Sequence, residues 1–317
     1  MKKINIRNLN SAIQEEYDIF LCSASFEQRC LSIPSKLKTK KFKKVIILEN
    51  KNYSKIIEDN AKELYKLYPN SGTLISVEYS NSLLLADTIA KMINSVSGRN
   101  FKVLIDITTF THEALMICLK ILNINKKVKS VVCLYVNAME YCPGQEIDKK
   151  WLSQGCEELR PILGYPGLLL PSQKTHLVVI VGYEFNRAFD MITEVEPNSI
   201  TLAYGSPDKA LTEKDREANE FFNGLVQKMA FEFSSIDSIS VSCNDPRHMA
   251  QQLTQIYIDH CDENIIVVPM NNKMSTVGVA LAAMQNENVQ ICYAPAVIYN
   301  ESNYSLPGKD CYIFDYK

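Results

Sequence analysis

The stretch KVLIDITTFTHEALMICLKIL, at residues 102–122, decides the fold class of this chain. It begins with an apolar strand pattern at Val103, Leu104 and Ile105, and its second half has the amphipathic spacing of a helix. Between these two patterns, residues 106–112 carry one carboxylate, three hydroxyls and an imidazole. Open α/β sheets bind ligands where a strand ends and a helix begins, because unpaired helix N–H groups and the helix dipole favour anions.

The alternation of strand and helix extends over the first half of the chain. Apolar runs predict strands at residues 18–24, 44–50, 74–79, 103–105 and 130–136. Helical spacing follows the second and third of these runs, at residues 53–67 and 83–93. Continuously apolar strands that alternate with helices indicate a mostly parallel, doubly wound sheet.

The second half repeats this pattern after residues 142–173, whose concentration of Pro and Gly predicts an ordered linker. Strands are expected at residues 177–181, 199–204, 238–242, 264–270 and 289–294, with an added edge strand at 311–316. The two series of five strands correspond at an offset of roughly 160 residues, which favours an internal duplication over two unrelated domains.

We therefore expect an α/β fold with two tandem Rossmann-like, doubly wound, mostly parallel sheets that form a pseudo-dimer. The expected N-terminal domain spans residues 1–141, the linker spans 142–173, and the C-terminal domain spans 174–317. A chain of 317 residues is long enough for each domain to bury a core of its own.

The composition, 46% hydrophobic and 22% charged, is that of a globular protein. A formal net charge of -2 argues against general nucleic-acid binding, and the lysine cluster at residues 36–44 is typical of a solvated helix end. Several of the ten cysteines fall inside apolar patterns, as reduced cysteines do. No apolar run reaches the ~18 residues of a membrane span, and the first residues lack a signal-peptide core. We expect a cytoplasmic protein with no membrane association.

Several motifs with known chemistry are absent from the sequence. It contains no GxxxxGK[ST], no GxGxxG after either first strand and no GxSxG, which disfavours P-loop, dinucleotide and hydrolase-elbow sites. It also lacks CxxC and HExxH, and its four histidines are widely separated along the chain. We therefore expect neither a cofactor nor a metal.

The candidate site residues lie in the turns that follow the predicted strands. If the duplicated sheets pair side by side, these turns would meet in one interdomain crevice. Hydroxyls, amides, helix N-termini and a few cations suit the phosphate of a nucleotide-type ligand. The candidate ligand-binding residues are Ser23, Ser25, Glu27, Arg29, Thr108, Thr109, Thr111, Arg187, Asn271, Asn272, Lys273 and Ser275.

Three residues are candidates for catalysis: Asp106, His112 and Glu184. Asp106 would either orient His112 or cap the turn that follows its strand. His112 would be a phosphate donor or general acid-base, or else a solvent-exposed histidine of the first helical turn. As a catalytic carboxylate Glu184 would suit N-glycosidic cleavage; alternatively Glu184 with Arg187, and Glu27 with Arg29, would each form an ion pair that holds a loop.

Residues 106–116, DITTFTHEALM, resemble the strand-to-helix motif of CARF domains, in which an Asp-x-Thr-Gly-Gly-Thr-Lys-like turn follows a buried strand. CARF domains are Rossmann-like, and SAVED domains are built from two CARF-like halves; both sense cyclic oligonucleotides in prokaryotic immunity. The resemblance implies ligand contacts from Thr108, Thr111 and His112, with 271–273 as the counterpart in the second half. The two glycines of the motif are Thr109 and Phe110 here, and His112 replaces its lysine.

We therefore expect a nucleotide-binding sensor of prokaryotic defence, with a cyclic oligonucleotide as a candidate ligand and a protein effector as partner. Slow cleavage of the ligand by Asp106 and His112 stays open. Two alternatives remain: a nucleotide or NAD N-glycosidase that uses Glu27 or Glu184, and a structural subunit of a multiprotein defence complex.

Overall fold

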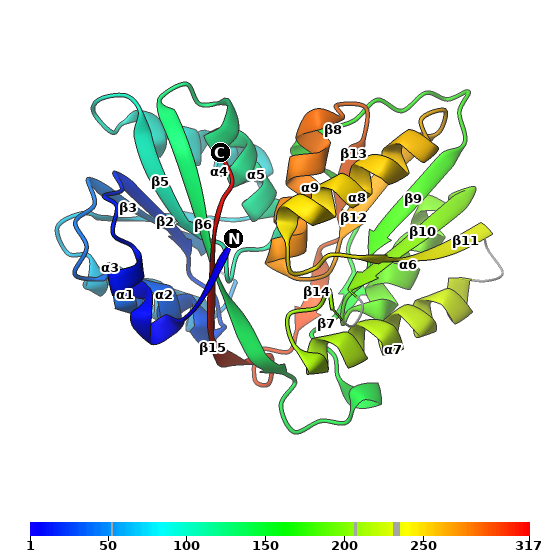
Figure 1. The fold of residues 1–317 in the computed structure, drawn as a ribbon, viewed down its shortest axis with the longest axis horizontal. Coiled ribbons are helices and arrows are strands. Elements are labelled where there is room, and N and C mark those ends of the chain that lie inside the picture. The colour runs from blue at the N-terminus through cyan, green and yellow to red at the C-terminus, as the bar shows by residue number, and fades with distance from the viewer. Residues whose placement is uncertain (52, 206–207, 231–234) are drawn as a thin grey trace. The chain divides into compact units, whose positions relative to one another are not determined.

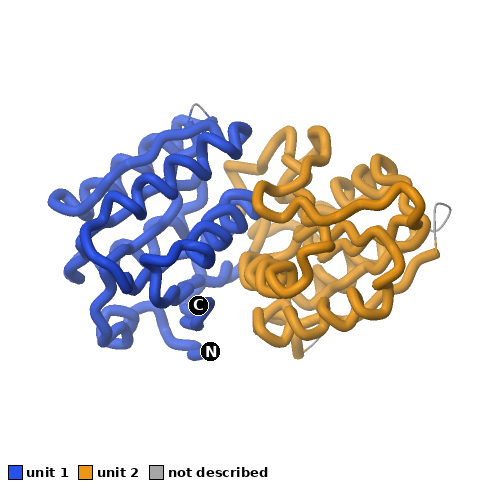
Figure 2. The backbone as a smooth tube through the Cα atoms, turned by 90° about the horizontal axis from the view of Figure 1, so that it is seen from above, with its two compact units in different colours: residues 1–140, 305–317 blue, residues 141–304 orange. Residues whose placement is uncertain are grey.

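The computed structural model describes residues 1–51, 53–205, 208–230 and 235–317 (Figure 1). The chain divides into two compact units, coloured separately in Figure 2. Unit 1 comprises Met1–Glu140 and Ser305–Lys317, and unit 2 comprises Tyr141–Tyr304. Each unit contains one main α/β sheet with its own buried core. The predicted fold class, two mostly parallel α/β sheets, is confirmed.

Unit 1 is organised around a seven-stranded sheet in the order β1-β15-β6-β5-β2-β3-β4. Strands β2 to β6 run parallel and match the five strands predicted from the first half of the sequence. Their bounds are β2 Ile19–Ser23, β3 Lys44–Asn50, β4 Gly72–Val77, β5 Phe101–Asp106 and β6 Val128–Tyr141.

The helices of unit 1 begin where side chains can cap them. The longer helices are α3 (Lys55–Leu67), α4 (Ser82–Asn94) and α5 (His112–Ile124), and the shorter ones are α1 (Leu9–Ala12) and α2 (Ser32–Leu37). Ser54, Asn81 and Thr111 each accept a backbone N–H of the first turn of α3, α4 and α5, respectively. Such caps satisfy N–H groups that have no partner inside the helix. Helix α5 is buried around most of its first half, so it is less amphipathic than its sequence suggested.

Unit 2 has a six-stranded sheet in the order β11-β10-β9-β12-β13-β8. Its strands are β9 Thr175–Ile180, β10 Ser199–Gly205, β11 Ser235–Val241, β12 Asn264–Pro269, β13 Gln290–Tyr293 and β8 Arg160–Pro166. Figure 1 shows α6 (Phe185–Val195) and α7 (Glu213–Ala230) on one face of this sheet. Helices α8 (Pro246–Asp259) and α9 (Lys273–Gln285) cover the other face, as expected of a doubly wound fold.

The two sheets share one topology. Numbering the five predicted strands of each half from one to five, both sheets have the order 3-2-1-4-5. In each sheet the second and third strands lie on one side of the first strand, and the fourth and fifth strands lie on its other side. The shared order agrees with the internal duplication proposed from sequence spacing.

The chain crosses between units in a way that the sequence did not predict. The segment expected as a linker, residues 142–173, lies inside unit 2, where it forms β7 (Ser153–Cys156) and β8. Strand β7 pairs with β14 (Ala296–Tyr299), and β8 runs antiparallel to β13. These segments form strands because they satisfy their backbone groups against the neighbouring strands.

The prediction of an edge strand at residues 311–316 was wrong in its position. Strand β15 (Ser305–Asp315) returns to unit 1, where it lies between β6 and the edge strand β1 (Lys2–Asn5). The N–H of Tyr316 donates to the Val131 carbonyl over 2.8 Å, and Cys311 is fully buried. The last strand therefore completes the first sheet, whereas the sequence had placed it in the C-terminal domain.

Candidate functional site

The crossover point of unit 1, where the order of strand addition reverses, lies between the adjacent parallel strands β2 and β5. The connections from these two strands leave in opposite directions along the sheet, which opens the usual ligand crevice at their carboxyl ends. A side chain bridges this crevice: Thr109 Oγ1 donates to the Ser23 carbonyl oxygen over 2.9 Å. Thr111 then caps α5 by accepting the Ala114 N–H over 3.2 Å. Thr109 and Thr111 both stay partly exposed, so they can reach a ligand.

Asp106 is buried at the end of β5. Its Oδ1 accepts the Thr108 N–H over 3.0 Å and the Thr108 hydroxyl over 2.5 Å, while Thr108 Oγ1 accepts the Val136 N–H over 3.1 Å. Burial raises the pKa of Asp106 to about 7, against the hydrogen bonds from Thr108 and the charge of Arg29, which lower it. These contacts match the turn-capping interpretation, because they join the ends of β5 and β6 and leave Asp106 only 2% exposed.

His112 is the first residue of α5 and is 8% exposed. It is therefore not the solvent-exposed histidine that its place in a first helical turn suggested. The neighbouring Glu113 and Ala114 are also buried, so this end of α5 is embedded in unit 1.

Glu27 and Arg29 form a buried ion pair in unit 1. Arg29 Nε and Nη2 both donate to Glu27 Oε2, over 2.8 and 2.6 Å, and Arg29 Nη1 donates to the Val136 carbonyl over 3.1 Å. The Ser305 hydroxyl also donates to Glu27 Oε2 over 2.6 Å, which ties β15 to the turn after β2. Because its carboxylate is committed to these donors, Glu27 fits a structural role better than catalysis.

The two remaining serines of this turn are also buried. The Ser23 hydroxyl lies 3.1 Å from the Tyr79 hydroxyl, and Ser25 Oγ accepts the Glu27 N–H over 3.2 Å. Both side chains therefore shape the turn from within, and neither has the exposure of Thr109 and Thr111.

Glu184 of unit 2 lies in a similar ion pair. Arg187 Nη1 is 2.7 Å from Glu184 Oε2 and donates to the Ser153 hydroxyl over 2.8 Å, and that hydroxyl donates to Glu184 Oε1. Burial lowers the pKa of Arg187, but the Glu184 carboxylate, together with smaller contributions from Tyr299, Tyr293 and Cys156, holds the pKa above its usual value. Ser153 was missed by sequence analysis because it lies in the segment interpreted as a linker. This cluster, like the one at Arg29, fits the ion-pair alternative.

The crossover point of unit 2 lies between β9 and β12. Asn271 Nδ2 donates to the Val181 carbonyl over 2.5 Å and to Asn219 Oδ1 over 3.0 Å. The backbones approach closely here, since a Cβ on Gly182 would lie 2.5 Å from the Met270 carbonyl oxygen. Asn219, on α7, belongs to this turn through contacts that no local sequence signal predicts.

The next residues form the N-terminus of α9. Asn272 caps the helix by accepting the Ser275 N–H over 2.9 Å, and its Nδ2 donates to the Cys243 carbonyl over 2.8 Å. Lys273 is the first helical residue and is partly exposed, whereas Ser275 is fully buried. The partly exposed members of this turn are therefore Asn271, Asn272 and Lys273.

The two crossover points are thus built alike. In each unit, one polar residue follows the fourth strand and donates to a carbonyl at the end of the first strand. This residue is Thr109 in unit 1 and Asn271 in unit 2. A capping residue, Thr111 or Asn272, then starts a helix of 13 residues. The structure brings the predicted residues of each turn together within their own unit, and the composite interdomain pocket stays a prediction.

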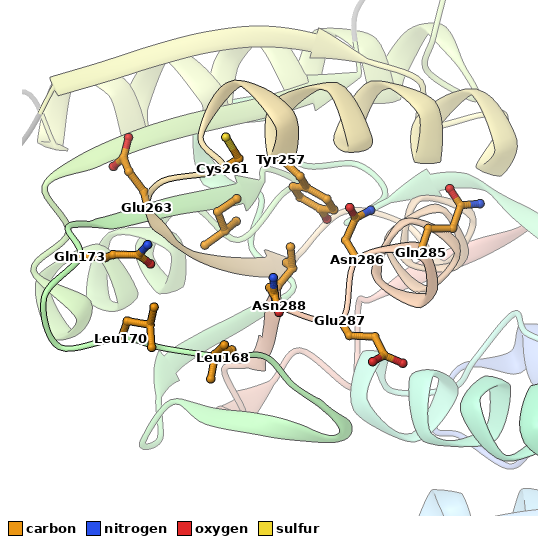
Figure 3. Close-up of a pocket in the computed structure, with 12 residues that line it drawn as sticks. Leu168, Leu170, Gln173, Tyr257, Cys261, Glu263, Gln285, Asn286, Glu287 and Asn288 are labelled. Carbon is orange, nitrogen blue, oxygen red and sulfur yellow. The ribbon is translucent and has the colours of Figure 1, made fainter.

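Two cavities lie at the opposite, amino-terminal edges of the sheets. One in unit 2, of about 430 Å³, lies beside the starts of β12 and β13, and one in unit 1, of about 500 Å³, lies beside the starts of β3 and β4 (Figure 3 shows the first). Near the first, His176, His260 and Glu263 place their ligand atoms within 4.8 Å of one another. Histidines that are widely separated in sequence therefore do meet in the fold, and the argument from their spacing against a metal cluster was wrong.

Comparison with known proteins supplies no further guide. No protein-family model matches the chain, and no curated protein matches it significantly. In the described part of the chain, every helix is too short or too polar to cross a membrane.

Proposed function

We propose that this protein binds a nucleotide-type ligand at the carboxyl edges of its sheets and acts as a sensor in prokaryotic defence that signals to a protein partner. The observation that carries the proposal is the matched pair of crossover turns, one in each unit. Repeating one ligand-binding edge in two units suits a ligand that itself repeats a chemical unit. Cyclic oligonucleotides have this property, and the resemblance of residues 106–116 to CARF domains supports the same class.

The chemistry of the exposed turn residues supports phosphate recognition. Lys273 places a cation at the first position of α9, where the helix dipole also favours an anion. Thr109, Thr111, Asn271 and Asn272 add hydroxyl and amide donors. Asp106 and Glu184, by contrast, are buried in hydrogen-bonded clusters, so we expect binding without turnover.

The first experiment is mass spectrometry of any small molecule that leaves the purified protein on denaturation. Thermal-shift measurements with mono-, di- and cyclic nucleotides then follow. A ligand that binds only the folded state raises the melting temperature by an amount that grows with its concentration. We expect Thr111→Ala and Lys273→Ala each to reduce that shift.

Helix α3 offers matched controls for both variants. Ser54 caps α3 as Thr111 caps α5, and Lys55 is the first residue of α3 as Lys273 is of α9. Ser54→Ala should lower basal stability as Thr111→Ala does, and Lys55→Ala removes a first-turn cation as Lys273→Ala does, but both control variants should leave the ligand shift unchanged. If no nucleotide shifts the melting temperature, the structural-subunit alternative is favoured, and release of a free base would favour the glycosidase.

A further inference from the structure

A cluster of polar side chains lies at the amino-terminal edge of unit 2, away from the crossover turns. His176 is the second residue of β9 and pairs in register with Ser199 of β10. His260 caps the C-terminus of α8, and Glu263 follows it just before β12. The Glu263 N–H donates to the His260 carbonyl over 3.0 Å, so one tight turn holds both residues.

A continuous set of hydrogen bonds joins these side chains. His260 Nδ1 lies 2.9 Å from Glu263 Oε1, and the Ser199 hydroxyl donates to Glu263 Oε2 over 3.1 Å. His176 Nδ1 lies 2.7 Å from Ser199 Oγ, and its Nε2 lies 3.0 Å from Thr201 Oγ1. Because Ser199 contacts both His176 and Glu263, Nδ1 is the His176 nitrogen on the Glu263 side.

We propose that His176, His260 and Glu263 form a binding site for a divalent transition-metal ion of the Zn²⁺ class. Their ligand atoms already lie within 4.8 Å of one another. Two imidazoles and a carboxylate are a donor set that Zn²⁺ accepts, with the fourth position left to water. Imidazole donors favour such ions over Mg²⁺ or Ca²⁺, which prefer oxygen ligands.

The surroundings of two of the donors, His176 and Glu263, favour the protonation states that bind metal. Burial, and then the nearby His260, lower the pKa of His176 to about 4, so its imidazole is neutral at neutral pH. Burial alone would raise the pKa of Glu263, but hydrogen bonds from His260 and Ser199 outweigh it and lower the pKa. Thr201 Oγ1 can accept a hydrogen bond from His176 Nε2–H when Nδ1 binds an ion, which is the outer contact that metal-bound histidines usually make.

The cavity of about 430 Å³ borders the cluster at Glu263, which lines it. Figure 3 shows the Glu263 carboxylate pointing away from Leu170 and Gln173, which also line the cavity. The side chains of His260 and Glu263 are 23% and 21% exposed, whereas His176 is fully buried. An ion would therefore meet the carboxylate and His260 first.

Metal binding requires one adjustment. The rings of His176 and His260 are stacked, with centroids 3.5 Å apart and planes 13° apart, so their nitrogen lone pairs lie in nearly parallel planes. Lone pairs must converge on a shared ion. Both ring nitrogens of His176 lie within hydrogen-bond distance of a hydroxyl, which fixes that ring. His260, in contrast, lies at a helix end with a partly exposed side chain. We therefore expect the His260 ring to turn when the ion binds.

The test is titration of the full-length protein with Zn²⁺ after the chelator used to strip it has been removed. Isothermal titration calorimetry should find one Zn²⁺ bound per chain, and this binding should require the His176, His260 and Glu263 cluster. His260→Asn and Glu263→Gln each remove a ligand while keeping a side chain of similar size. We expect each to weaken affinity more than the ~10–100-fold that loss of an outer contact costs, and Thr201→Val to fall within that range.

Two variants control for other binding. His248 is exposed on the same helix as the His260 cap, so His248→Ala should bind Zn²⁺ as the unchanged protein does. Cys261 is exposed and lines the same cavity, and Cys261→Ser should also keep the affinity. Loss of binding in Cys261→Ser together with full binding in His260→Asn would overturn the assignment and indicate a thiolate site.

A second measurement needs no substitution. Nitrogen-15 spectra of the imidazole rings should show Zn²⁺ shifting the resonances of two histidines, His176 and His260, and sparing His112 and His248. Unchanged spectra at saturating Zn²⁺ would refute the site even if the variants fail to fold. Since this site lies at the opposite sheet edge, its outcome is independent of the proposed nucleotide binding.

Discussion

Replacing Asp106 by Asn should stabilise unit 1 at neutral and alkaline pH. Burial raises the folded-state pKa of this carboxyl to about 7, from 3.8 for an ordinary aspartate. The folded protein therefore binds a proton that the unfolded chain has already lost, and its stability falls as pH rises between these two values. At ~1.4 kcal/mol per pKa unit, the full loss is about 4 kcal/mol. Asn stays neutral and keeps an oxygen that accepts both hydrogen bonds from Thr108.

The assay compares urea unfolding of the unchanged protein and of Asp106→Asn between pH 5 and pH 9. A spectroscopic probe in unit 1 monitors the unfolding. We expect the stability gap in favour of Asp106→Asn to widen by ~1.4 kcal/mol per pH unit up to about pH 7 and then to level off. Carbon-13 spectra of labelled aspartate give the pKa directly, because the Asp106 resonance is the one missing from the variant.

Asp18 provides a control of opposite sign in the same unit. Burial would raise its pKa, but hydrogen bonds from Lys43 and the Lys102 backbone outweigh it and lower the pKa. The stability that the Asp18 carboxylate contributes is therefore present above the unfolded-state pKa and is lost as the solution is acidified. Asp18→Asn should accordingly destabilise unit 1 at neutral pH. A pKa below 5 for Asp106, or a gap that does not change with pH, would refute the reasoning about its burial.

Three further predictions concern packing and reactivity. Gly182→Ala should destabilise unit 2 by about 1–3 kcal/mol because its Cβ would collide with a backbone carbonyl, whereas Gly224→Ala, in open space on α7, should stabilise it by about 0.5–1 kcal/mol; urea unfolding compares the two. Arg187→Met leaves the Glu184 carboxylate buried without its cation and should cost about 3–5 kcal/mol, a loss that adding Glu184→Gln should partly reverse. Cys261 is the exposed cysteine among ten, so a thiol reagent should label it first in the native protein, and Cys261→Ser should remove that fast phase.

Local sequence patterns predicted the parts of this fold that depend on neighbouring residues. The apolar runs predicted the ten parallel strands found among the described residues. Caps such as Asn81 and Thr111 are local in the same way, because a cap acts within three residues of itself. The sequence analysis predicted a doubly wound sheet but not the order of its strands. Parallel strands joined by helices leave few ways to connect them.

Long-range partners could not be predicted in the same way. The pattern of β15 indicates a strand but does not say which sheet will pair with it, and the answer was the distant β6. Ser153 and Asn219 entered the crossover regions through contacts made 34 and 52 residues away in sequence. His176 and His260 meet because the turn after α8 folds back onto the start of β9 and β10, which no spacing rule for adjacent ligands describes.

The two edges of the unit 2 sheet differ in what they leave available to a ligand. At the carboxyl edge, Asn271 and Asn272 are already bonded to backbone carbonyls, so a ligand there must exchange those bonds for its own. Each exchange replaces one hydrogen bond by another and adds little net affinity, unless the new acceptor is charged, as a phosphate oxygen is. At the amino edge, Glu263 lines a cavity, and its carboxylate lies close to ligand atoms of His176 and His260. Under the two proposals, the same sheet would select a phosphate at one edge and a metal cation at the other.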